Sequence, residues 1–427
     1  MKAGIIPSEI ADSKPFKKSS IGYFTQQFLF EKLKKLRRGQ ITIMDLGQFK
    51  TFGQITKAFP LKTTIRIHDP RFYTRIALGG SIGAAEAYMD GFWSTDDLTT
   101  VIRILIQNQS VFDEMENGWT RLSIPFHRVY HALRRNTLQG SQANIIAHYD
   151  LGNDFYALFL DETMTYSCGI FEREQSSLAE ASIAKYRRIC QKLQLTRKDH
   201  VLEIGTGWGS FAIFAAKYYG CRVTTTTISP EQYKLAFQRI RQEGLTDKIT
   251  LLCRDYRKME GCYDKLVSIE MIEAVGHQYL DTFFSTCSRL LCENGMMVLQ
   301  AITIRDHLYE QHKNSVDFIK RYIFPGGSLP SIAAMTTSIA HATDLILFHL
   351  EDITPHYAKT LQEWHKGFFS NIGKVRAMKF SETFIRMWEY YLCYCEAGFT
   401  ERYIGNVQML LTKPLCRREP VLPPWVE

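Results

Sequence analysis

The feature that most constrains the fold is a regular alternation of apolar, strand-length runs with helix-length segments, beginning near residue 199. The expected strands are 201–205, 222–227, 249–254, 265–271 and 296–304, and the expected helices are 210–219, 230–243 and 278–291. Alternation of this kind predicts an α/β domain with a doubly wound, mostly parallel sheet. Ligands of such sheets bind at the carboxyl ends of the first strands, where the strand order reverses.

A glycine-rich loop links the first expected strand to the first expected helix, in the segment Glu203-Ile204-Gly205-Thr206-Gly207-Trp208-Gly209. Glycines at 205 and 207 let the backbone turn sharply and let a ligand approach it closely. The spacing G-x-G-x-G differs from the dinucleotide fingerprint G-x-G-x-x-G, and no G-x-x-x-x-G-K-[ST] phosphate loop occurs. With Glu203 just before it, the loop fits the pattern of S-adenosylmethionine (SAM) methyltransferases. NAD(P) and no ligand at all are the alternatives.

The second expected strand departs from the usual methyltransferase pattern. Many enzymes of that class end this strand with an acidic residue that binds the ribose hydroxyls. Here the strand ends in four threonines, Thr224 to Thr227. We therefore expect Thr227 and Gln232 to serve the ribose region instead.

The first third of the chain carries all the excess positive charge. Residues 1–140 hold 20 Lys and Arg against 12 Asp and Glu, a net of +8, whereas residues 141–427 hold 32 of each. The densest cluster comprises Lys14, Lys17, Lys18, Lys32, Lys34, Lys35, Arg37 and Arg38. Such a cluster attracts a polyanion, either nucleic acid or an anionic membrane face. For any single lysine, a solvated helix face is the alternative.

The N-terminal part predicts a small α+β domain. Residues 20–38 have Phe and Leu at helical spacing between Lys and Arg, which indicates an amphipathic helix that ends at Gly39. This helix either lies on a membrane surface or packs on its own domain. The other expected features are strands at 40–52 and 62–68, a Gly79-Gly80 turn and a helix at 82–89. We place the domain at 1–120 and a connector at 121–145.

The ten cysteines all lie at or after Cys168, and none forms a C-x-x-C pair. This spacing argues against a disulfide framework or a metal site, so we expect free thiols in a reducing compartment. No apolar run reaches the roughly 18 residues that span a bilayer. The N-terminus also lacks the features of a secretory signal. A cytoplasmic protein without a bound metal is therefore expected.

From about His148 to Lys413 the sequence resembles the cyclopropane-fatty-acyl-phospholipid synthases. The motifs are HYDLGNDFYALFLDETMTYSCGIF (148–171), LEIGTGWGSFAIFAA (202–216), TTISPEQ (226–232), DYR (255–257), SIEMIEAVGH (268–277) and DFIKRYIFPGGSLPS (317–331). The N-terminal extension is similar to that of the long bacterial forms. The resemblance implies a Rossmann-like class I SAM-dependent methyltransferase domain at 146–413 and a tail at 414–427. In that family, a methylene group from SAM is added to the cis double bond of a phospholipid acyl chain, with bicarbonate as the base.

The resemblance places a bicarbonate pocket at Cys168, Glu273, Gln300, the backbone of Ile302 and Tyr357. Glu273 would orient the ion, Tyr357 and the amide of Ile302 would donate hydrogen bonds to it, and Cys168 would lie beside it. Gln300 stands where the best-known bacterial members have histidine, as in plant-type members. Because an amide donates a hydrogen bond but does not titrate, the product stays open between a cyclopropane ring and a methyl or methylene branch.

The resemblance also implies the residues that contact SAM. Tyr166 and Ser167 would meet its methionine end, and Asp255 and Tyr256 would hold and cover the adenine. The full predicted set is Tyr166, Ser167, Glu203, Gly205, Gly207, Trp208, Gly209, Thr227, Gln232, Asp255 and Tyr256. His148, Tyr149 and Asp150 would help to close the site.

The predicted partners follow from charge and resemblance together. The stretch 305–343 is expected to be a lid over the acyl chain. The basic first third would dock transiently on anionic phospholipid at the inner face of the membrane, and the family precedent favours a homodimer. Nucleic acid is disfavoured because the catalytic part is neutral and has no base-reading motif. A non-catalytic lipid- or nucleic-acid-binding protein is the remaining alternative, and the intact Cys168, Glu273 and glycine loop argue against it.

Overall fold

The computed structural model describes residues 20–111 and 151–421, which form two compact units. Each unit draws on separate stretches of the chain. The first unit takes 20–111, Val316–Phe318 and Ile372–Tyr403, and the second takes 151–315, Ile319–Asn371 and 404–421. Residues 372–403 were expected in the catalytic domain, but they pack within the first unit. Their hydrogen-bond partners lie about 300 residues away in the chain, so no local pattern could show this.

The first unit is built on a four-stranded sheet in the order β2-β1-β3-β4. Its strands are β1 (Gly39–Asp45), β2 (Gln48–Gln54), β3 (Lys62–Ile67) and β4 (Trp93–Thr95). The expected single strand at 40–52 is a hairpin instead. Leu46 and Gly47 both have positive φ, at 50° and 77°, as a tight two-residue hairpin turn requires.

Helices from both ends of the chain complete the first unit. They are α1 (Ser20–Leu33), α2 (Arg71–Met89), α3 (Leu98–Gln107), α15 (Ile372–Ala377) and α16 (Glu382–Thr400). Buried polar contacts join α16 to α2 and α3. Tyr88 donates to Glu389 over 2.7 Å, and Thr99 donates to Glu396 over 3.1 Å. The helix α1 buries Leu29, Phe30 and Leu33 within its own unit.

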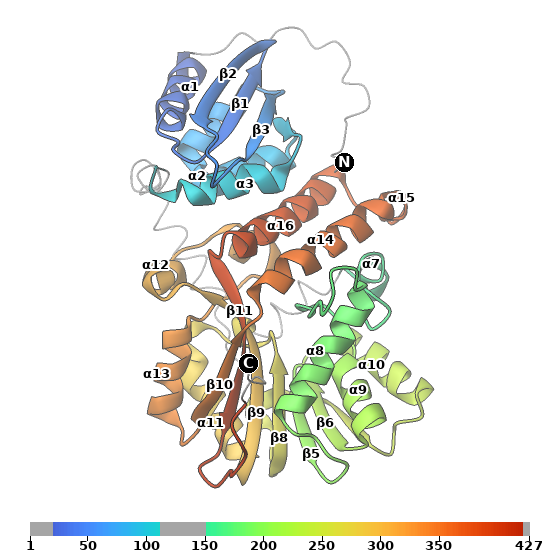
Figure 1. Ribbon diagram of the computed structural model, residues 1–427. Helices are drawn as coiled ribbons and strands as arrows, with labels where there is room; N and C mark the ends of the chain where they lie inside the picture. Colours follow the sequence, from blue (N-terminus) through green and yellow to red (C-terminus); the bar gives the residue numbers. More distant parts are fainter. Residues whose placement is uncertain (1–19, 112–150, 422–427) are drawn as a thin grey trace. The chain divides into compact units, whose positions relative to one another are not determined.

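The second unit contains a seven-stranded sheet in the order β10-β11-β9-β8-β5-β6-β7 (Figure 1). The strands are β5 (His200–Ile204), β6 (Arg222–Thr227), β7 (Ile249–Cys253), β8 (Tyr263–Ile269), β9 (Leu291–Ile304), β10 (Ile346–Asp352) and β11 (Ile404–Thr412). In this sheet β11 runs opposite to the other six strands, and so pairs antiparallel with both β10 and β9. The predicted doubly wound, mostly parallel sheet is confirmed, and its strand order reverses between β5 and β8.

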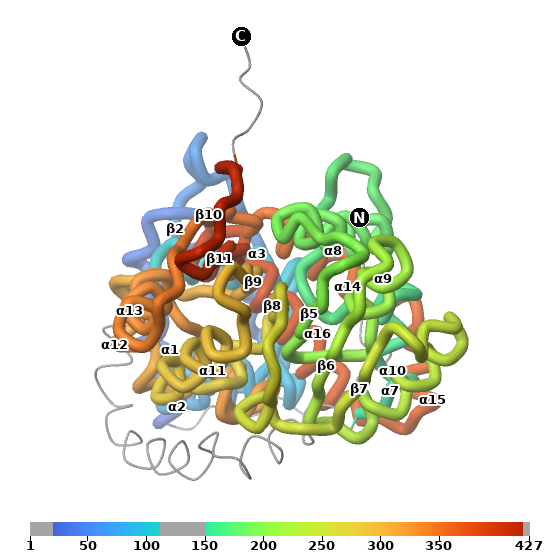
Figure 2. The backbone as a smooth tube through the Cα atoms, turned by 90° about the horizontal axis from the view of Figure 1, so that it is seen from below, coloured from blue at the N-terminus to red at the C-terminus, as the bar shows by residue number. Residues whose placement is uncertain are grey.

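Helices cover both faces of this sheet (Figure 2). One face packs against α8 (Leu178–Lys192), α9 (Ser210–Tyr219) and α10 (Pro230–Gln242), and the other against α11 (Leu280–Leu290) and α13 (Ile332–Ala342). The remaining α-helices of the unit are α7 (Asn153–Tyr156), α12 (Tyr309–Lys313) and α14 (Thr354–Ser370). Local signals start several of them. Ser229 caps α10 with Pro230 in its first turn, and Ser177 and Glu180 form a capping box on α8.

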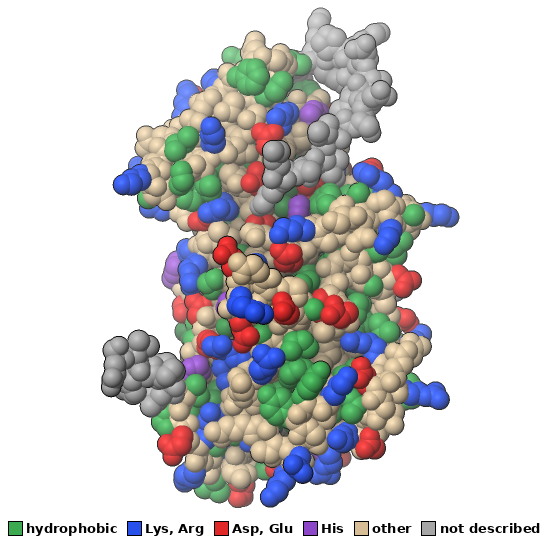
Figure 3. All heavy atoms as spheres, turned by 45° about the vertical axis from the view of Figure 1, so that its right-hand side comes forward, with side chains coloured by type: hydrophobic (Ala, Val, Ile, Leu, Met, Phe, Trp, Pro, Cys, Tyr) green, Lys and Arg blue, Asp and Glu red, His purple; other side chains and the backbone are tan. Residues whose placement is uncertain are grey.

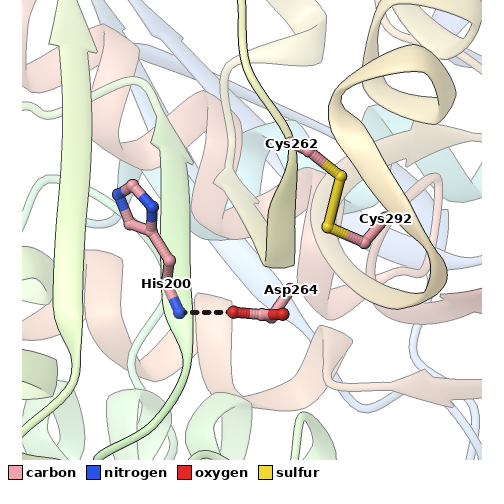
Figure 4. The surroundings of a disulfide bond; sticks show 4 residues. All are labelled: His200, Cys262, Asp264 and Cys292. Carbon is pink, nitrogen blue, oxygen red and sulfur yellow. Dashed lines mark hydrogen bonds between the residues drawn. A yellow bond between two sulfur atoms is a disulfide. The ribbon is translucent and has the colours of Figure 1, made fainter.

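Cys262 and Cys292 form a disulfide beside the start of β8 (Figure 4). The same view shows Asp264 accepting a hydrogen bond from the amide of His200 over 2.8 Å. The expectation of free thiols is therefore wrong for this pair, while the other eight cysteines are free. The two residues are 30 positions apart in sequence, and the pairing of β8 with β9 brings their Cα atoms to 5.3 Å. Spacing along the chain does not show this register.

The surface carries both signs of charge. On the face drawn in Figure 3, basic and acidic side chains are interspersed. Of the predicted basic cluster, Lys34, Lys35, Arg37 and Arg38 are exposed, and Lys14, Lys17 and Lys18 lie outside the described residues. Among the described helices, none combines the length and the apolar character that crossing a bilayer requires.

Candidate active site

The glycine loop has the geometry of a ligand cradle. Gly205, Gly207 and Gly209 all have positive φ, at 100°, 52° and 87°, which favours glycine at each position. The amides of Gly205 and Thr206 both donate to the carbonyl of Thr226 over 3.1 Å, which fixes the loop on β6. A Cβ atom built on Gly207 would meet nothing within 4 Å. The backbone there faces open space, as a loop that accepts a ligand must.

Three predicted SAM residues form internal hydrogen bonds beside this loop. The buried carboxyl of Glu203 accepts from the hydroxyl of Thr225 over 2.6 Å, and burial raises the pKa of Glu203 to about 8. The hydroxyl of Thr227 donates to the side-chain oxygen of Gln232 over 2.9 Å, and both side chains are buried. These hydrogen bonds thus fix the side chains at the ends of β5 and β6, next to the glycine loop.

The predicted adenine residues follow β7. The carboxylate of Asp255 accepts from the amide of Arg257 over 2.9 Å and from its guanidinium over 2.9 and 2.6 Å. Burial raises the pKa of Asp255, but these hydrogen bonds outweigh it and hold that pKa below its usual value. The ring of Tyr256 packs 5.6 Å from the ring of Phe283. Asp255 is therefore fixed by its own neighbour.

Aromatic rings connect two predicted residues from separate motifs. Tyr156 lies 5.2 Å from Tyr166 and 5.1 Å from Trp208, measured between ring centroids. Tyr166 also stacks on Trp364 at 5.0 Å. The indole nitrogen of Trp208 donates to the side-chain oxygen of Asn153 over 2.7 Å. The cluster offers ring faces, which attract positive charge, directly beside the glycine loop.

Ser167 has a charged partner that the sequence analysis missed. The ammonium group of Lys185 donates to the hydroxyl of Ser167 over 2.6 Å. Lys185 is fully buried, and burial lowers its pKa to about 8. The signal in the sequence was its position on the apolar face of α8, one turn from Ala181 and one turn from Ile189, both of which are buried.

The centre of the remaining predicted site is a residue that the sequence analysis did not single out, Glu270. One carboxylate oxygen, Oε1, accepts from the amide of Cys168 over 3.1 Å, from Gln300 Nε2 over 2.8 Å and from Asn406 Nδ2 over 2.6 Å. The other oxygen accepts from the hydroxyl of Tyr357 over 2.7 Å. We call these five residues the Glu270 cluster. Its members come from five separate parts of the chain.

Glu273, on the short turn after β8, lies next to this cluster. Its Oε1 accepts from the amide of Ile302, while its Oε2 is buried and makes no hydrogen bond with the described residues. Burial, and then the negative charge of Glu270, raise the pKa of Glu273 to about 8. Glu273 is thus mostly protonated at neutral pH. The structure therefore brings together all five residues predicted for the bicarbonate pocket. Glu273 is one of them, and the other four bind the carboxyl group of Glu270 or of Glu273.

Cys168 is a neutral thiol in this setting. Its Sγ donates to the carbonyl of Gly169 over 3.2 Å. Burial, reinforced by the charge of Glu270, raises the pKa of Cys168 well above its usual value. The thiolate is the nucleophilic form of cysteine, and this thiol is held in the protonated form, while the backbone amide of Cys168 is the group that contacts Glu270.

A second layer of buried polar groups sets the direction of the Gln300 amide. Gln300 Oε1 accepts from Gln408 Nε2 over 3.0 Å, and Gln408 Oε1 accepts from Lys192 Nζ over 2.7 Å. Lysine only donates and a carboxylate only accepts, so Lys192 at one end and Glu270 at the other fix both amides. Gln408 lies opposite Gln300 in the pairing of β11 with β9, which the sequence does not reveal. Glu270, by contrast, was visible inside the motif SIEMIEAVGH.

The glycine loop and the Glu270 cluster are neighbours. A Cβ atom built on Gly205 would lie 3.3 Å from the side chain of Met271, the residue after Glu270. Ser268 at the end of β8 also donates to the carbonyl of Ile204 at the end of β5, over 3.1 Å. Both parts therefore lie where the strand order reverses, as ligand sites in such sheets do. The predicted closing residues His148–Asp150 lie outside the described residues.

Comparisons with known proteins agree with this architecture. The family described as mycolic acid cyclopropane synthetase matches residues 136–409. The tuberculostearic acid methyltransferase UfaA1 of Mycobacterium tuberculosis is 36% identical over 388 residues, covering 89% of this chain and 90% of that protein. The cyclopropane-fatty-acyl-phospholipid synthase of Escherichia coli K12 is 34% identical over 360 residues, covering 82% and 87%.

A solved structure gives the same result. The mycolic acid cyclopropane synthase CmaA1, complexed with SAH and CTAB, aligns with a TM-score of 0.59 and 35% identity, covering 64% of this chain and 98% of that one. The glycine loop and the sheet order are accounted for by this relationship. The chain belongs to the mycolic acid cyclopropane synthetase family and is a SAM-dependent methyltransferase with the class I fold.

Proposed function

We propose that this enzyme adds a methylene group from SAM to the cis double bond of an unsaturated phospholipid acyl chain and closes a cyclopropane ring. The observation that supports the proposal is that the glycine loop lies next to the Glu270 cluster, since Gly205 adjoins Met271, the residue after Glu270. A methyl donor bound at the loop would then lie close to carboxyl groups that can hold or accept a proton. The phospholipid substrate is that named for the E. coli relative, which matches 82% of this chain.

The chemistry explains why the site needs both parts. SAM, when bound, supplies an electrophilic methyl group, and the open backbone around Gly207 fits such a ligand. Attack by the alkene leaves a carbocation on the acyl chain, so water has to be excluded and a base has to be close. The ring faces of Tyr156, Tyr166 and Trp364 attract positive charge.

Bicarbonate is the base that the resemblance predicts, and the residues present do not fit it. Three residues of the expected pocket already bind Glu270, through the backbone amide of Cys168, the side-chain amide of Gln300 and the hydroxyl of Tyr357. A fourth, the amide of Ile302, binds Glu273. We therefore derive no step through bicarbonate.

We further propose that the first unit docks on an anionic membrane. Ile21, Tyr23 and Phe24 on α1 are between 60% and 67% exposed, although they are large and apolar. Exposed basic residues follow α1 directly, at Lys34, Lys35, Arg37 and Arg38. Apolar and basic groups in one region suit an anionic lipid surface. The homodimer and the lid at 305–343 stay predictions of the resemblance and of chain position.

A methyl- or methylene-branched product is the second candidate. The relative named as a tuberculostearic acid methyltransferase matches 89% of this chain. Both products begin with methylation of the same kind of alkene, and they differ in where the carbocation lies when the proton leaves. We propose that the Glu270 cluster lies next to the proton that leaves. It is thus the region that would decide between the two products.

The test uses SAM with a fully deuterated methyl group and vesicles of a monounsaturated anionic phospholipid. Ring formation predicts loss of one deuterium and upfield ring protons in the proton NMR spectrum of the product. Loss of one deuterium without ring protons would show a methylene branch, and an intact labelled methyl would show methylation without ring closure. Absence of label in lipid, with SAM binding intact, would contradict the proposed function.

A further inference from the structure

We propose that the carboxylate of Glu270 is the built-in base of this enzyme and takes the place that the resemblance gives to bicarbonate. The inference rests on the proposed function, since it assigns the group that removes the proton after methyl transfer. It predicts an enzyme that works without bicarbonate.

The strongest support is the set of groups that surround this carboxylate. A carboxylate and a bicarbonate ion both present two oxygens, in one plane, that accept hydrogen bonds. Glu270 accepts four, from Cys168, Gln300, Asn406 and Tyr357, at 3.1, 2.8, 2.6 and 2.7 Å. Three of these donors are the ones predicted for the ion. The side chain thus fills the expected ion site with the same chemical group.

The backbone of Glu270 supports the same assignment. Its φ is +49°, in the left-handed region of backbone conformation that residues other than Gly, Asn and Asp rarely adopt. Its amide donates to the carbonyl of Gln300 over 2.8 Å, which anchors the turn after β8. Strained backbone of this kind persists where surrounding contacts over-determine it, and it recurs at active sites. Here the four side-chain hydrogen bonds provide those contacts.

Hydrogen bonds distinguish the two carboxyl groups of Glu270 and Glu273. Two carboxyl groups close together resist ionising at once. Glu273 accepts one hydrogen bond and has a buried oxygen without a partner, whereas Glu270 accepts four. The raised pKa of Glu273, about 8, keeps its proton in place at neutral pH. The hydrogen bonds therefore favour Glu270 over Glu273 as the group that accepts a proton.

The proposed step balances in atoms and charge. After methyl transfer, one C–H bond of the new methyl group breaks and its proton passes to a carboxylate oxygen of Glu270. The electron pair of that bond forms the last carbon–carbon bond of the ring and neutralises the carbocation. Glu270 becomes a neutral acid and returns the proton to solvent before the next turnover. A hydrogen-bonded carboxylate is a weak base, but a proton next to a carbocation is very acidic, so the position of the base matters more than its strength.

The first experiment needs no variant. Lipid product is measured with the wild-type enzyme in carbon-dioxide-free buffer and again with added bicarbonate. We expect the two rates to agree within about twofold, because the base belongs to the chain. A wild-type rate that rises at least about tenfold with added bicarbonate would overturn the proposal.

The second experiment removes the carboxylate. Glu270→Gly suits the positive φ and opens space, and we expect its rate to fall by about 100-fold or more, with partial recovery on adding bicarbonate or formate. Glu270→Gln should lose as much activity without recovery, because its amide fills the space. Glu243→Gln, which changes an exposed carboxylate in the same unit, is the control and should match the wild type.

Further measurements separate the possible failures. SAM binding by calorimetry and the melting temperature show whether each Glu270 variant is folded. A folded Glu270→Gly enzyme with wild-type activity would overturn the assignment of Glu270 but leave the proposed function intact. If the wild type transfers no label to lipid with or without bicarbonate, the proposed function itself fails, and the role of Glu270 fails with it.

Discussion

The two halves of the active site are built in opposite ways. The glycine loop is one run of five residues, 205–209, whose shape depends on backbone conformation. The Glu270 cluster gathers side chains and amides from five distant parts of the chain, and its shape depends on their hydrogen bonds. The comparison teaches that the half which follows from local conformation is visible as a motif. The half that depends on strand register becomes visible only in three dimensions.

The largest expected effect on ligand binding tests whether the loop half depends on backbone conformation alone. Gly205→Ala puts a Cβ atom at φ +100°, a conformation that is strained for alanine, and 3.3 Å from the side chain of Met271, so that the loop or Met271 has to shift. We expect SAM affinity, measured by calorimetry, to fall by about 30-fold or more, because roughly 2 kcal/mol of strain falls on the binding loop.

The matched control is Gly244→Ala in the same unit. Gly244 also has positive φ, at 67°, but a Cβ atom there would meet nothing within 4 Å. The Gly244→Ala variant should lose about 1 kcal/mol of stability and retain its affinity for SAM. Equal loss of affinity in both variants would show that general destabilisation, and not the loop, weakens binding.

The next prediction concerns charge in the cluster half. Because the pKa of Glu273 is raised to about 8, the folded protein keeps a proton that the unfolded chain releases above about pH 4.5. The contribution of Glu273 to stability therefore falls as pH rises from about 4.5 to 8. Glu273→Gln removes this dependence on pH. At pH 8 the free energy of unfolding of the variant should therefore exceed that of the wild type by on the order of a few kcal/mol.

Urea unfolding at pH 5 and at pH 8 checks this prediction. The difference in unfolding free energy between variant and wild type should be larger at pH 8. Glu260→Gln, an exposed position just before β8, should give the same difference at both pH values. A difference for Glu273→Gln that does not change with pH would mean that Glu273 is ionised throughout this range.

The smallest expected effect tests the second layer of the cluster. Lys192→Met removes the donor that fixes Gln408, so both amides can turn and Gln300 loses its set direction toward Glu270. We expect kcat to fall about three- to tenfold with SAM affinity unchanged, which corresponds to roughly 1 kcal/mol.

Arg188→Met is the control for this change. Arg188, like Lys192, forms an ion pair with Glu351, but it makes no hydrogen bond to Gln408 among the contacts described. Its kcat should stay within about twofold of the wild type. If both variants lose the same activity, the ion pairs with Glu351 matter and the direction of the amides does not.

The parallel sheet was predictable because its signals are local. Apolar runs such as Val201–Gly205 and the cap at Ser229-Pro230 are dictated by residues near them in sequence, and the structure has β5 and α10 there. The prediction was wrong where a tight turn or a contact between distant residues determines the structure. The run 40–52 became a hairpin at Leu46-Gly47, and Cys262 met Cys292 through the register of β8 and β9.

The site divides in the same way. Gly205 and Gly207 could be assigned from spacing, and the residues of the predicted bicarbonate pocket could be assigned from resemblance. Glu270 lies within the motif SIEMIEAVGH, but nothing in the sequence shows that its side chain meets Gln300 and Tyr357. Asn406 lies on β11, about 130 residues from Glu270, and carries no motif at all. Contacts of this range follow from the folded sheet and not from any local pattern.

The order of folding during synthesis follows from the way the first unit combines segments that lie far apart in the chain. Its helices α2 and α3 receive α16 as a packing partner, and α16 ends at Thr400. The ribosome therefore has to release nearly the whole chain before this unit can reach its final form. Until then the apolar faces that α16 covers stay open to water, to chaperones or to another copy of the chain. Cutting the gene near residue 130 would separate α2 and α3 from α16, so neither fragment would hold the whole first unit, whereas the second fragment would still contain all segments of the second unit.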